Sequence, residues 1–275
     1  MALTEIAYLG PEGTFAHLVA KKRFRDHLLV PQSTIADVFR YVRAKSNRCG
    51  IVPTENSSGG TIHTTVDELI DRTKGVFIQE ELSINVRLAL LGHKRKPVRV
   101  VYSHFAPFHH CDTWLTNHYP RVKRQEVSST GEAVKLASKE KDAAAIGNRE
   151  AGGLYGLDVL QFPIEQDIKN VTQFFAVGHP LEDTGPGSKM SLLVSLKDSP
   201  GSLCSFLEPI KKAGVNLSRI VSRTVIGHPS KYVFFVDIVG TAKDPSVARA
   251  LRDAKRSALH IEVVGIYPVR PQYTS

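Results

Sequence analysis

The stretch GIVPTENSSGGTIHTTVDEL, residues 50–69, changes character twice. An apolar run ends at Pro53, polar residues and paired glycines follow, and apolar side chains then recur at helical spacing from Ile62 to Ile70. This order predicts a strand that ends at Pro53 and a helix that opens near Thr61. Backbone N–H groups at a helix start lack partners within the helix and attract anions. We therefore expect the side chains of Glu55, Asn56, Ser57 and Ser58, and unpaired backbone N–H groups beside them, to lie exposed at a place that favours anion binding.

The same alternation of strand and helix continues through the first part of the chain. Short β-branched runs, such as IAYLG at residues 6–10 and VRVVYS at 98–103, each precede a helical pattern. This alternation is typical of parallel α/β sheets. The segments 75–92 and 160–178 are β-branched and predict strands that cross between two lobes. Two crossings would leave a cleft, which is a favoured place for a small ligand. Helices are expected over 14–27, 61–73, 106–118 and 149–155.

A change of composition at residues 178–189, GHPLEDTGPGSK, predicts a linker because glycine, proline and charge replace apolar residues. The patterns after it follow the order strand, helix, strand, strand, helix, strand. That βαββαβ order is typical of a ferredoxin-like domain. The predicted α/β protein therefore has a first domain at 1–180, with one lobe formed by 1–77 and 163–180 and the other by 78–162, and a second domain at 189–271.

Length and composition restrict the class of protein. A chain of 275 residues, 42% hydrophobic and 23% charged, can bury a sizeable core. It contains no apolar run near the roughly 20 residues that span a bilayer, and its start does not resemble a secretory signal, so we expect no membrane partner and a cytoplasmic location. Cys49, Cys111 and Cys204 have no Cys-x-x-Cys spacing, which favours ordinary buried thiols over disulfides or zinc.

The formal net charge of +9 raises the question of nucleic-acid binding. The basic runs at 21–25 and 93–99 match no nucleic-acid module, and the remaining charge is dispersed. We expect these runs to be solvated and no nucleic acid to be a partner. A positive field equally suits the steering of a small dianionic substrate into a cleft.

The sequence gives little support for a metal site or for the nucleophilic site of a hydrolase. His104, His109 and His110 lie near Cys111 and Asp112, but adjacent residues on a helix point in different directions, so we expect no metal site. A hydrolase would need a nucleophile and base, and the Gly-x-Ser-x-Gly pattern of a nucleophile elbow does not occur. A hydrolase remains a minor alternative.

Six segments in chain order resemble motifs of the bacterial prephenate dehydratases, and the resemblance covers nearly the whole chain. Each segment alone is weakly specific, whereas six in the family's order are strongly so. The segments are GPEGTF at 10–15, VPTENSSGGTI at 52–62, SHFAPFHHC at 103–111, SSTGEA at 128–133, AAIGNREAGGLYGL at 144–157 and IEQDIKNVTQF at 164–174.

The second domain resembles an ACT domain of the phenylalanine-binding kind, through PGSL at 200–203 and VSRT at 221–224. The resemblance implies two α/β lobes like those of a periplasmic binding protein, followed by ACT domains that pair in a homodimer or homotetramer. L-Phenylalanine would be the allosteric effector. Val221 and Thr224 stand where the family has Glu and Pro, which leaves the effector's identity and affinity open. The implied effector-binding residues are Gly201, Ser202, Leu203, Asn216, Leu217, Ser222 and Arg223.

The implied reaction converts prephenate to phenylpyruvate, water and carbon dioxide in phenylalanine biosynthesis, without a cofactor or metal. Thr172 matches the family's threonine that hydrogen-bonds the leaving hydroxyl; without the resemblance it would be read as an ordinary strand residue. The implied catalytic residues are Thr172, Asn56, Ser57, Gln173 and Phe174. The implied substrate-binding residues are Gly10, Pro11, Gly13, Thr14, Phe15, Glu55, Ser103, His104, Ser129, Thr130 and Asn170.

One departure from the family pattern bears directly on activity. Gln173 stands where the motif has arginine, and a glutamine cannot supply an ionic clamp. Arg149 or Arg87 is a candidate to compensate. The alternatives are a phenylalanine-sensing protein with weak dehydratase activity, and an enzyme for a related small anionic or lactone-like substrate.

Overall fold

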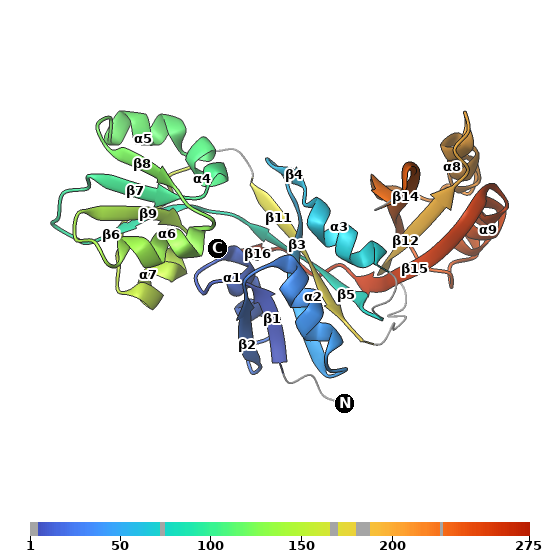
Figure 1. The fold of residues 1–275 in the computed structure, drawn as a ribbon, viewed down its shortest axis with the longest axis horizontal. Helices are drawn as coiled ribbons and strands as arrows, with labels where there is room; N and C mark the ends of the chain where they lie inside the picture. The colour runs from blue at the N-terminus through green and yellow to red at the C-terminus, as the bar shows by residue number, and fades with distance from the viewer. Residues whose placement is uncertain (1–4, 72–74, 166–169, 180–187, 226–227) are drawn as a thin grey trace.

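The computed structural model describes residues 5–71, 75–165, 170–179, 188–225 and 228–275 (Figure 1). The first lobe contains parallel strands covered by helices, as the alternation predicts. β11 pairs antiparallel with β3 on one side and with β5 on the other, and β5 and β11 connect this lobe with the second. The elements are β1 (Glu5–Leu9), α1 (Phe15–Arg23), β2 (Leu28–Gln32), α2 (Ile35–Arg43), β3 (Arg48–Asn56), β4 (Gly60–Thr61), α3 (His63–Ile70), β5 (Phe77–Asn85) and β11 (Val171–Gly178).

Residues 50–69 differ from the prediction at the end of the strand. β3 does not end at Pro53 but continues to Asn56, and the chain then turns back so that β4 pairs with β3. The Asn56 side-chain oxygen accepts the backbone N–H groups of Ser58 and Gly59, both at 3.0 Å, which closes the turn. The helix expected to open near Thr61 begins two residues later, at His63. Residues 56–61 form a hairpin turn, and the helix begins beyond it.

The second lobe is a separate five-stranded sheet in the order β10-β6-β9-β7-β8. The helix expected over 106–118 is two shorter helices, because the chain leaves helical geometry at Cys111. β5 leads into this lobe and β10 precedes the return to β11, which confirms the two predicted crossings. The elements are β6 (Ala89–Gly92), β7 (Val100–Ser103), α4 (Phe105–His110), α5 (Asp112–His118), β8 (Lys123–Glu126), α6 (Thr130–Ala137), β9 (Ala143–Gly147), α7 (Arg149–Tyr155) and β10 (Asp158–Gln161).

The second domain has the predicted βαββαβ order. Its four long strands extend the sheet of the first lobe, giving the order β13-β14-β12-β15-β5-β11-β3-β1-β2. Gly265 permits the junction, since a Cβ there would lie 2.6 Å from the Cβ of Ile78 on β5. The elements are β12 (Ser188–Leu196), α8 (Ser202–Lys212), β13 (Leu217–Val225), β14 (His228–Val239), α9 (Pro245–Ala254), the 3-10 turn Lys255–Ser257, β15 (Ala258–Pro268) and β16 (Tyr273–Thr274).

The two faces of the second domain's sheet pack differently. One face is covered by α8 and α9, and the other packs on the first lobe. At that inner face Val221, Phe235 and Tyr267 share a buried cluster with Val66 of α3 and Phe175 of β11. Each such side chain contributes about 1.5–3 kcal/mol when fully buried. The two domains are therefore joined by hydrophobic core.

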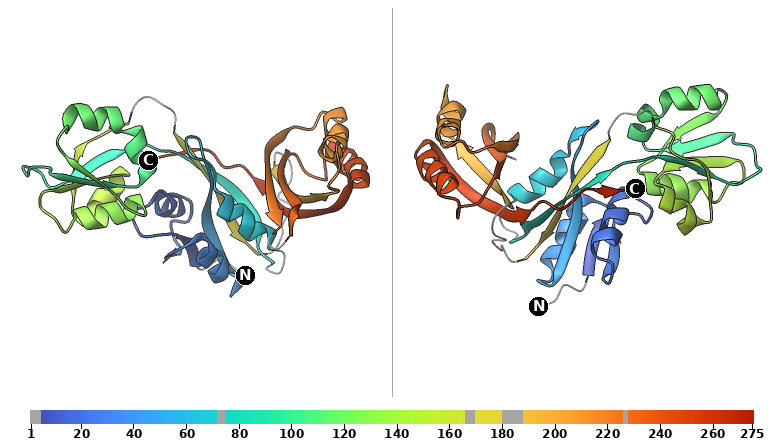
Figure 2. Two further views of the ribbon diagram at one scale, coloured as in Figure 1. Left: turned by 45° about the horizontal axis from the view of Figure 1, so that its top comes forward. Right: turned by 180° about the vertical axis from the view of Figure 1, so that it is seen from behind.

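The chain end returns to the place where the lobes join (Figure 2). β16 pairs with β5, and the Ser275 hydroxyl oxygen accepts the Arg87 backbone N–H at 2.7 Å. Residues 180–187, most of the predicted linker, lie outside the described residues, so the domain boundaries stay a prediction. In the described part of the chain, no helix is long and apolar enough to cross a membrane. Cys49 and Cys111 are buried as expected, whereas Cys204 is exposed.

Candidate active site

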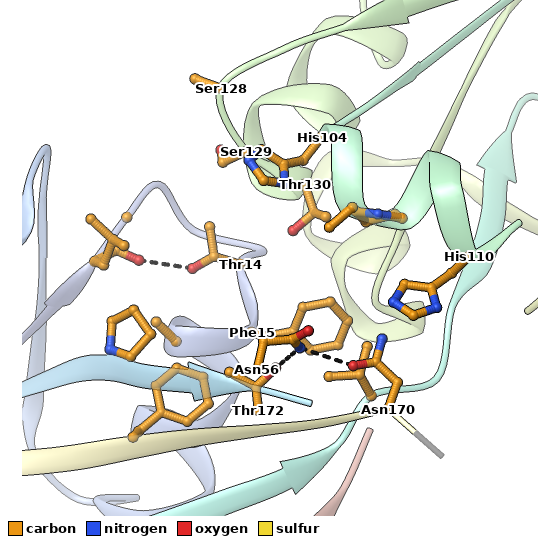
Figure 3. A pocket seen from close by; sticks show the side chains of 18 residues that line it. Thr14, Phe15, Asn56, His104, His110, Ser128, Ser129, Thr130, Asn170 and Thr172 are labelled. Atoms are coloured by element: carbon orange, nitrogen blue, oxygen red, sulfur yellow. Dashed lines mark hydrogen bonds between the residues drawn. The ribbon is translucent and has the colours of Figure 1, made fainter. Parts of the chain in front are cut away.

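A cavity of about 260 Å³ lies between the two lobes (Figure 3). The first lobe contributes the β1–α1 loop and the ends of β3 and β11, and the second contributes α4 and the turn before α6. This volume lies slightly below the roughly 300 Å³ at which pockets for drug-sized ligands begin, so the cavity suits a small organic molecule. The lining residues are Leu9, Gly10, Thr14, Phe15, Ala16, Pro53, Asn56, Val86, His104, Ala106, Pro107, His110, Ser128, Ser129, Thr130, Asn170, Thr172 and Phe174.

Asn56 and Thr172 are a cross-strand pair on β3 and β11. The Asn56 amide nitrogen donates to the Thr172 hydroxyl oxygen at 2.8 Å and to the Asn170 side-chain oxygen at 2.9 Å. Because the Asn56 oxygen already accepts two backbone N–H groups of the turn, the orientation of its amide is fixed by the network. A hydroxyl that accepts a hydrogen bond still has its own proton to donate. The Thr172 proton is thus left for a molecule in the cavity.

Two helices start at the cavity wall. Thr14 caps α1, where its hydroxyl oxygen accepts the His17 N–H at 3.2 Å and donates to the Leu9 carbonyl at 3.0 Å. Ser129 caps α6, accepting the Glu132 N–H at 3.1 Å. The first N–H groups of each helix have no carbonyl partner within it, and both positive dipole ends lie at the cavity. These two starts, rather than residues 56–61, supply the helix termini for anions.

The described residues that line the cavity include no lysine or arginine. The groups there that can gain a positive charge are His104 and His110. Burial lowers the pKa of His104, against a smaller opposite effect of Glu126. Burial also lowers the pKa of His110, reinforced by His109 and opposed by Glu165. The lowered pKa favours the neutral imidazole of each residue, which can donate a hydrogen bond at one ring nitrogen and accept one at the other.

The loop before α1 also ties the lobes together. Its Gly13 carbonyl accepts the Asn148 side-chain N–H at 2.5 Å, and its Glu12 carbonyl accepts the Tyr155 hydroxyl at 3.0 Å. Gly131 of α6 lies so close that a Cβ there would be 2.7 Å from the Glu12 carbonyl oxygen. The cavity is therefore closed on this side by direct contact between the lobes.

Many predicted site residues line this one cavity, and the remainder do not. Ser57 faces β11, where its hydroxyl oxygen accepts the Val171 N–H at 3.0 Å. Ser103 is buried and donates to the Ile146 carbonyl at 3.3 Å. The lining includes Gly10, Thr14, Phe15, Asn56, His104, Ser129, Thr130, Asn170, Thr172 and Phe174; it omits Pro11, Gly13, Glu55, Ser57, Ser103 and Gln173.

Glu55 and Gln173 lie on the opposite face of the same two strands, because successive side chains of a strand alternate. Both contact Arg219 of the second domain. The two arginines proposed to compensate for Gln173 are engaged elsewhere and do not line the cavity. Arg87 pairs with Glu165, and Arg149 lies over the Phe162 ring at 4.8 Å.

His110 is a lining residue that the motif comparison did not assign. Its helical spacing from Ala106 and Pro107 on α4 places all three on one side of the helix, next to His104. That spacing is the signal that identifies it. Figure 3 shows the His110 ring beside Asn170, across the cavity from Thr14. In the described residues, no group of three His, Cys, Asp or Glu side chains is arranged to hold a metal ion.

The predicted effector residues fall into two sets. Ser202 and Leu203 line a hollow of about 510 Å³ in the second domain, together with Tyr232 and Phe234. The second set lies on β13 or directly before it and does not line this hollow; its members are Asn216, Leu217, Ser222 and Arg223. On that strand Ser222 is exposed, and the Arg223 guanidinium binds both carboxylate oxygens of Asp67, at 2.6 and 2.7 Å.

Comparisons with known proteins agree with this architecture. The prephenate dehydratase family model matches residues 6–181, and the ACT domain model matches residues 190–256. The bifunctional chorismate mutase/prephenate dehydratase of Pseudomonas aeruginosa is 36% identical over 267 residues, which are 96% of this chain and 73% of that protein.

Two solved structures superpose along nearly the whole chain. The prephenate dehydratase from Arthrobacter aurescens, in complex with L-Phe, has a TM-score of 0.86 at 29% identity and covers 96% of this chain and 90% of its own. GqqA, described as a novel type of quorum quenching acylase, has a TM-score of 0.87 at 26% identity and covers 97% and 98%. The predicted fold class, a two-lobed α/β domain like that of periplasmic binding proteins followed by an ACT domain, is confirmed. The chain belongs to the prephenate dehydratase family.

Proposed function

We propose that this chain converts prephenate to phenylpyruvate, water and carbon dioxide, and that L-phenylalanine regulates it through the ACT domain. The observation that carries the proposal is the Asn56–Thr172 pair, which leaves a hydroxyl proton for a molecule in a cavity between two helix starts. Family membership supports the reaction, and the ACT match supports the regulation. The roles of individual residues in binding and catalysis are part of the proposal.

The substrate's two carboxylates suit the donors of this cavity. The starts of α1 and α6 offer unpaired N–H groups and positive dipole ends, which bind carboxylates without a side-chain cation. His104 and His110 offer further donors, and a bound dianion raises their affinity for protons. The overall charge of +9 draws dianions toward the protein.

The chemistry is a coupled loss of two groups from the substrate ring. The C–O bond to the ring hydroxyl breaks, and the oxygen takes up one proton, ultimately from the solvent, and leaves as water. The C–C bond to the ring carboxylate breaks, its electron pair enters the new aromatic ring, and carbon dioxide leaves. Thr172 donates a hydrogen bond to the departing oxygen, which stabilises charge developing there; being a weak acid, it is not the net source of the proton.

Part of the cavity wall is apolar. Leu9, Phe15, Val86 and Phe174 line the cavity beside the polar groups. Exclusion of water destabilises a carboxylate more than the neutral carbon dioxide that it becomes, so these walls favour decarboxylation. Gln173 stands where the family motif has arginine, but its side chain does not line this cavity. The difference from the motif therefore removes no cation from the cavity. It therefore gives no reason to prefer a sensor without activity.

For assembly we propose a homodimer formed through the second domain, with a homotetramer as the larger alternative, in the cytoplasm. β13 is an edge strand of the large sheet among the described residues. It exposes Ile220 at 44%, and neighbouring β14 exposes Tyr232 at 46%. Pairing through this edge would cover both side chains and bring the hollow of one protomer toward β13 of its partner. L-Phenylalanine would bind there.

The direct test is to incubate the purified protein with prephenate at neutral pH and follow the absorbance of phenylpyruvate, with and without L-phenylalanine. The proposal predicts steady phenylpyruvate formation that L-phenylalanine changes. A folded protein that forms no phenylpyruvate above the uncatalysed rate would contradict the proposed reaction. Unchanged turnover at saturating L-phenylalanine would contradict the proposed regulation.

A further inference from the structure

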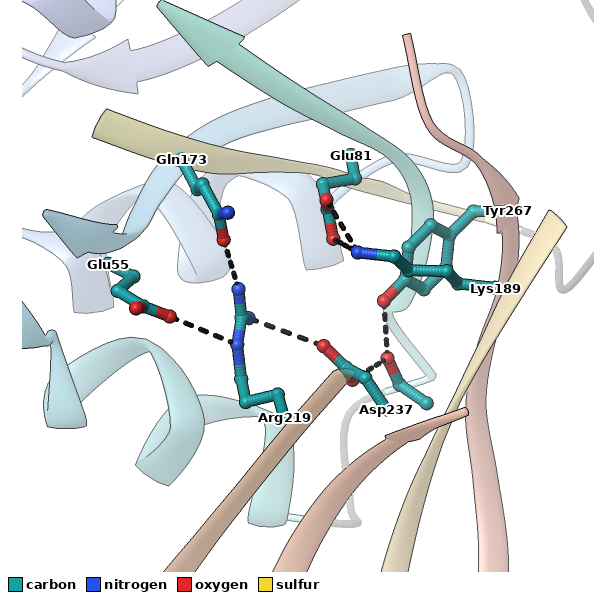
Figure 4. Close-up of polar contacts among 8 residues, drawn as sticks. Glu55, Glu81, Gln173, Lys189, Arg219, Asp237 and Tyr267 are labelled. Atoms are coloured by element: carbon teal, nitrogen blue, oxygen red, sulfur yellow. Dashed lines mark hydrogen bonds and ion pairs between the residues drawn. The ribbon is translucent and has the colours of Figure 1, made fainter. Parts of the chain in front are cut away.

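Arg219 of β13 reaches from the ACT domain to the back of the active-site strands (Figure 4). Its side chain is only 8% exposed. One terminal nitrogen, Nη2, donates to the Gln173 side-chain oxygen. The Nε lies 3.4 Å from a Glu55 carboxylate oxygen, and Nη1 lies 3.5 Å from a carboxylate oxygen of Asp237. One guanidinium therefore connects β13 with both β3 and β11.

The two residues that Arg219 holds on the first lobe are themselves a cross-strand pair. Gln173 is opposite Glu55, and the next pair along the ladder is Thr172 opposite Asn56. The register of the ladder shifts between Gln173 and Phe174, so strand pairing alone fixes this point less firmly. Any movement of the Gln173–Glu55 pair shifts the neighbouring pair that faces the substrate.

We propose that Arg219 is a positioning residue for the dehydratase site: the ACT domain supplies it, and it holds the Gln173–Glu55 pair so that Thr172 and Asn56 face the substrate correctly. This inference rests on the proposed function. It assigns a role to the charge absent at position 173. Arg219 of the ACT domain provides the cation, on the face of β11 that points away from the cavity.

On the ACT side, Arg219 is held by strand pairing and by buried polar partners. Arg219 is paired with Asp237 across β13 and β14, and Asp237 is fully buried. The Asp237 carboxylate accepts the Ser191 hydroxyl at 2.6 Å, and the Ser191 and Tyr267 hydroxyl oxygens are 2.6 Å apart. A buried guanidinium with planar donors suits several acceptors at once, which a lysine ammonium does not reproduce.

The same contact provides a route for regulation. Arg219 lies on β13 between Leu217 and Ser222, two of the proposed effector residues. A ligand that moves or stiffens β13 changes the contact of Arg219 with Gln173 and Glu55. The effect of L-phenylalanine on turnover should therefore depend on Arg219.

A purely structural role in joining the domains makes a different prediction, and the chain contains a matched control. Arg223, on the same face of β13, forms an ion pair with Asp67 of α3. Asp67→Asn weakens this second interdomain ion pair without touching β3 or β11. If Arg219 only joins the domains, Arg219→Met and Asp67→Asn should alter turnover alike.

The experiment measures phenylpyruvate formation by wild type, Arg219→Met, Arg219→Lys and Asp67→Asn, with thermal melting as the folding check. We expect Arg219→Met to lower kcat by about tenfold or more with KM changed less than about twofold, since displaced catalytic groups cost rate rather than substrate binding. Arg219→Lys should recover part of kcat, and Asp67→Asn should retain wild-type kcat. Arg219→Met should also weaken the response to L-phenylalanine.

A charge exchange keeps the test decisive if Arg219→Met fails to fold. Gln173→Arg alone places two guanidinium groups together and should lower kcat, whereas Gln173→Arg combined with Arg219→Gln should restore it. Wild-type kcat in folded Arg219→Met, equal losses in Arg219→Met and Asp67→Asn, or no restoration by the exchange would overturn the inference. Wild type that forms no phenylpyruvate would instead overturn the proposed function, and this inference with it.

Discussion

The two faces of the β3–β11 ladder bear opposite kinds of chemistry. The cavity face presents Asn56, Thr172 and Phe174, in a lining whose described residues include no lysine or arginine. The other face presents Glu55 and Gln173, which meet a buried arginine and its carboxylate partners. A motif that is continuous in sequence is thus divided between two sites, because neighbouring strand residues point to opposite sides. In the proposed function, neutral donors contact the substrate on one face, and charged groups hold the strands on the other.

The largest effect is expected on the cavity face, from Thr172→Val. Valine keeps the branched shape but removes the hydroxyl that faces the leaving group. We expect kcat to fall by about 10²–10³-fold, the usual loss when a donor to developing charge is removed. Thr172→Ser should retain most activity, and both variants should melt near the wild-type temperature. Turnover of Thr172→Val close to wild type would remove Thr172 from its proposed role.

A second test reverses one hydrogen bond without changing shape. Asn56→Asp keeps an oxygen for the Ser58 and Gly59 N–H groups, but the group facing Thr172 becomes an acceptor. The Thr172 proton is then drawn toward the carboxylate instead of the substrate. We expect kcat to fall by about 10–10²-fold, in the range for lost orientation of a catalytic group. If kcat stays unchanged while the protein remains folded, the inferred direction of this hydrogen bond is wrong.

On the charged face, the pH dependence of stability tests whether Asp237 is buried as described. Burial raises its pKa to about 6, against the opposing effects of Arg219 and Ser191. The folded protein then keeps this proton at pH values where the unfolded chain has lost it, so the group's contribution to stability is present at pH 4 and declines as pH rises to 6.

Asp237→Asn removes this titration. The melting temperature of the variant minus that of wild type should therefore rise between pH 4 and 6 and level off above. Thermal melting at several pH values, in one buffer series of constant ionic strength, measures the difference. A difference that is constant or falls over this range would show that Asp237 is not held as described.

The smallest effect is expected for His110→Gln. The pKa of His110 is lowered by burial, so wild type should bind the dianionic substrate better as pH falls and the imidazole gains a proton. We expect KM to rise by about two- to tenfold in the variant, the worth of one net hydrogen bond, with the larger factor at the lower pH. Parallel KM profiles from pH 6 to 8 in wild type and variant would exclude a charged His110 from substrate binding.

The sequence predicts most of the fold because its signals are local. Strand and helix alternation, the two crossings and the βαββαβ order all follow from periodicity within short windows. The turn after Asn56 was missed because a side chain closes it, and a polar stretch before a helical pattern looks the same whether or not it pairs back on its strand. The break at Cys111 likewise leaves the apolar pattern intact.

The candidate site was predicted only in part. Motifs identify which residues occur together, but they do not say which side of a strand each faces. Gln173 was therefore assigned to the cavity with Thr172, although its partner is Arg219. That partner follows it by 46 positions and belongs to another domain, so no local pattern connects them. His110 was also missed, although its helical spacing from Ala106 and Pro107 on α4 was a signal that could have found it.

Arg219 is proposed to act through Thr172, and the sharpest test is a double-mutant cycle in which kcat for phenylpyruvate formation is measured. Thr172→Val, Arg219→Met and the double variant are compared with wild type under saturating prephenate. If Arg219 serves to position Thr172, adding Arg219→Met to Thr172→Val should lower kcat little further, because the group that it positions is already gone. If kcat of the double variant falls by the product of the two single-variant factors, the two substitutions act independently. That result would contradict the proposal that Arg219 acts through Thr172.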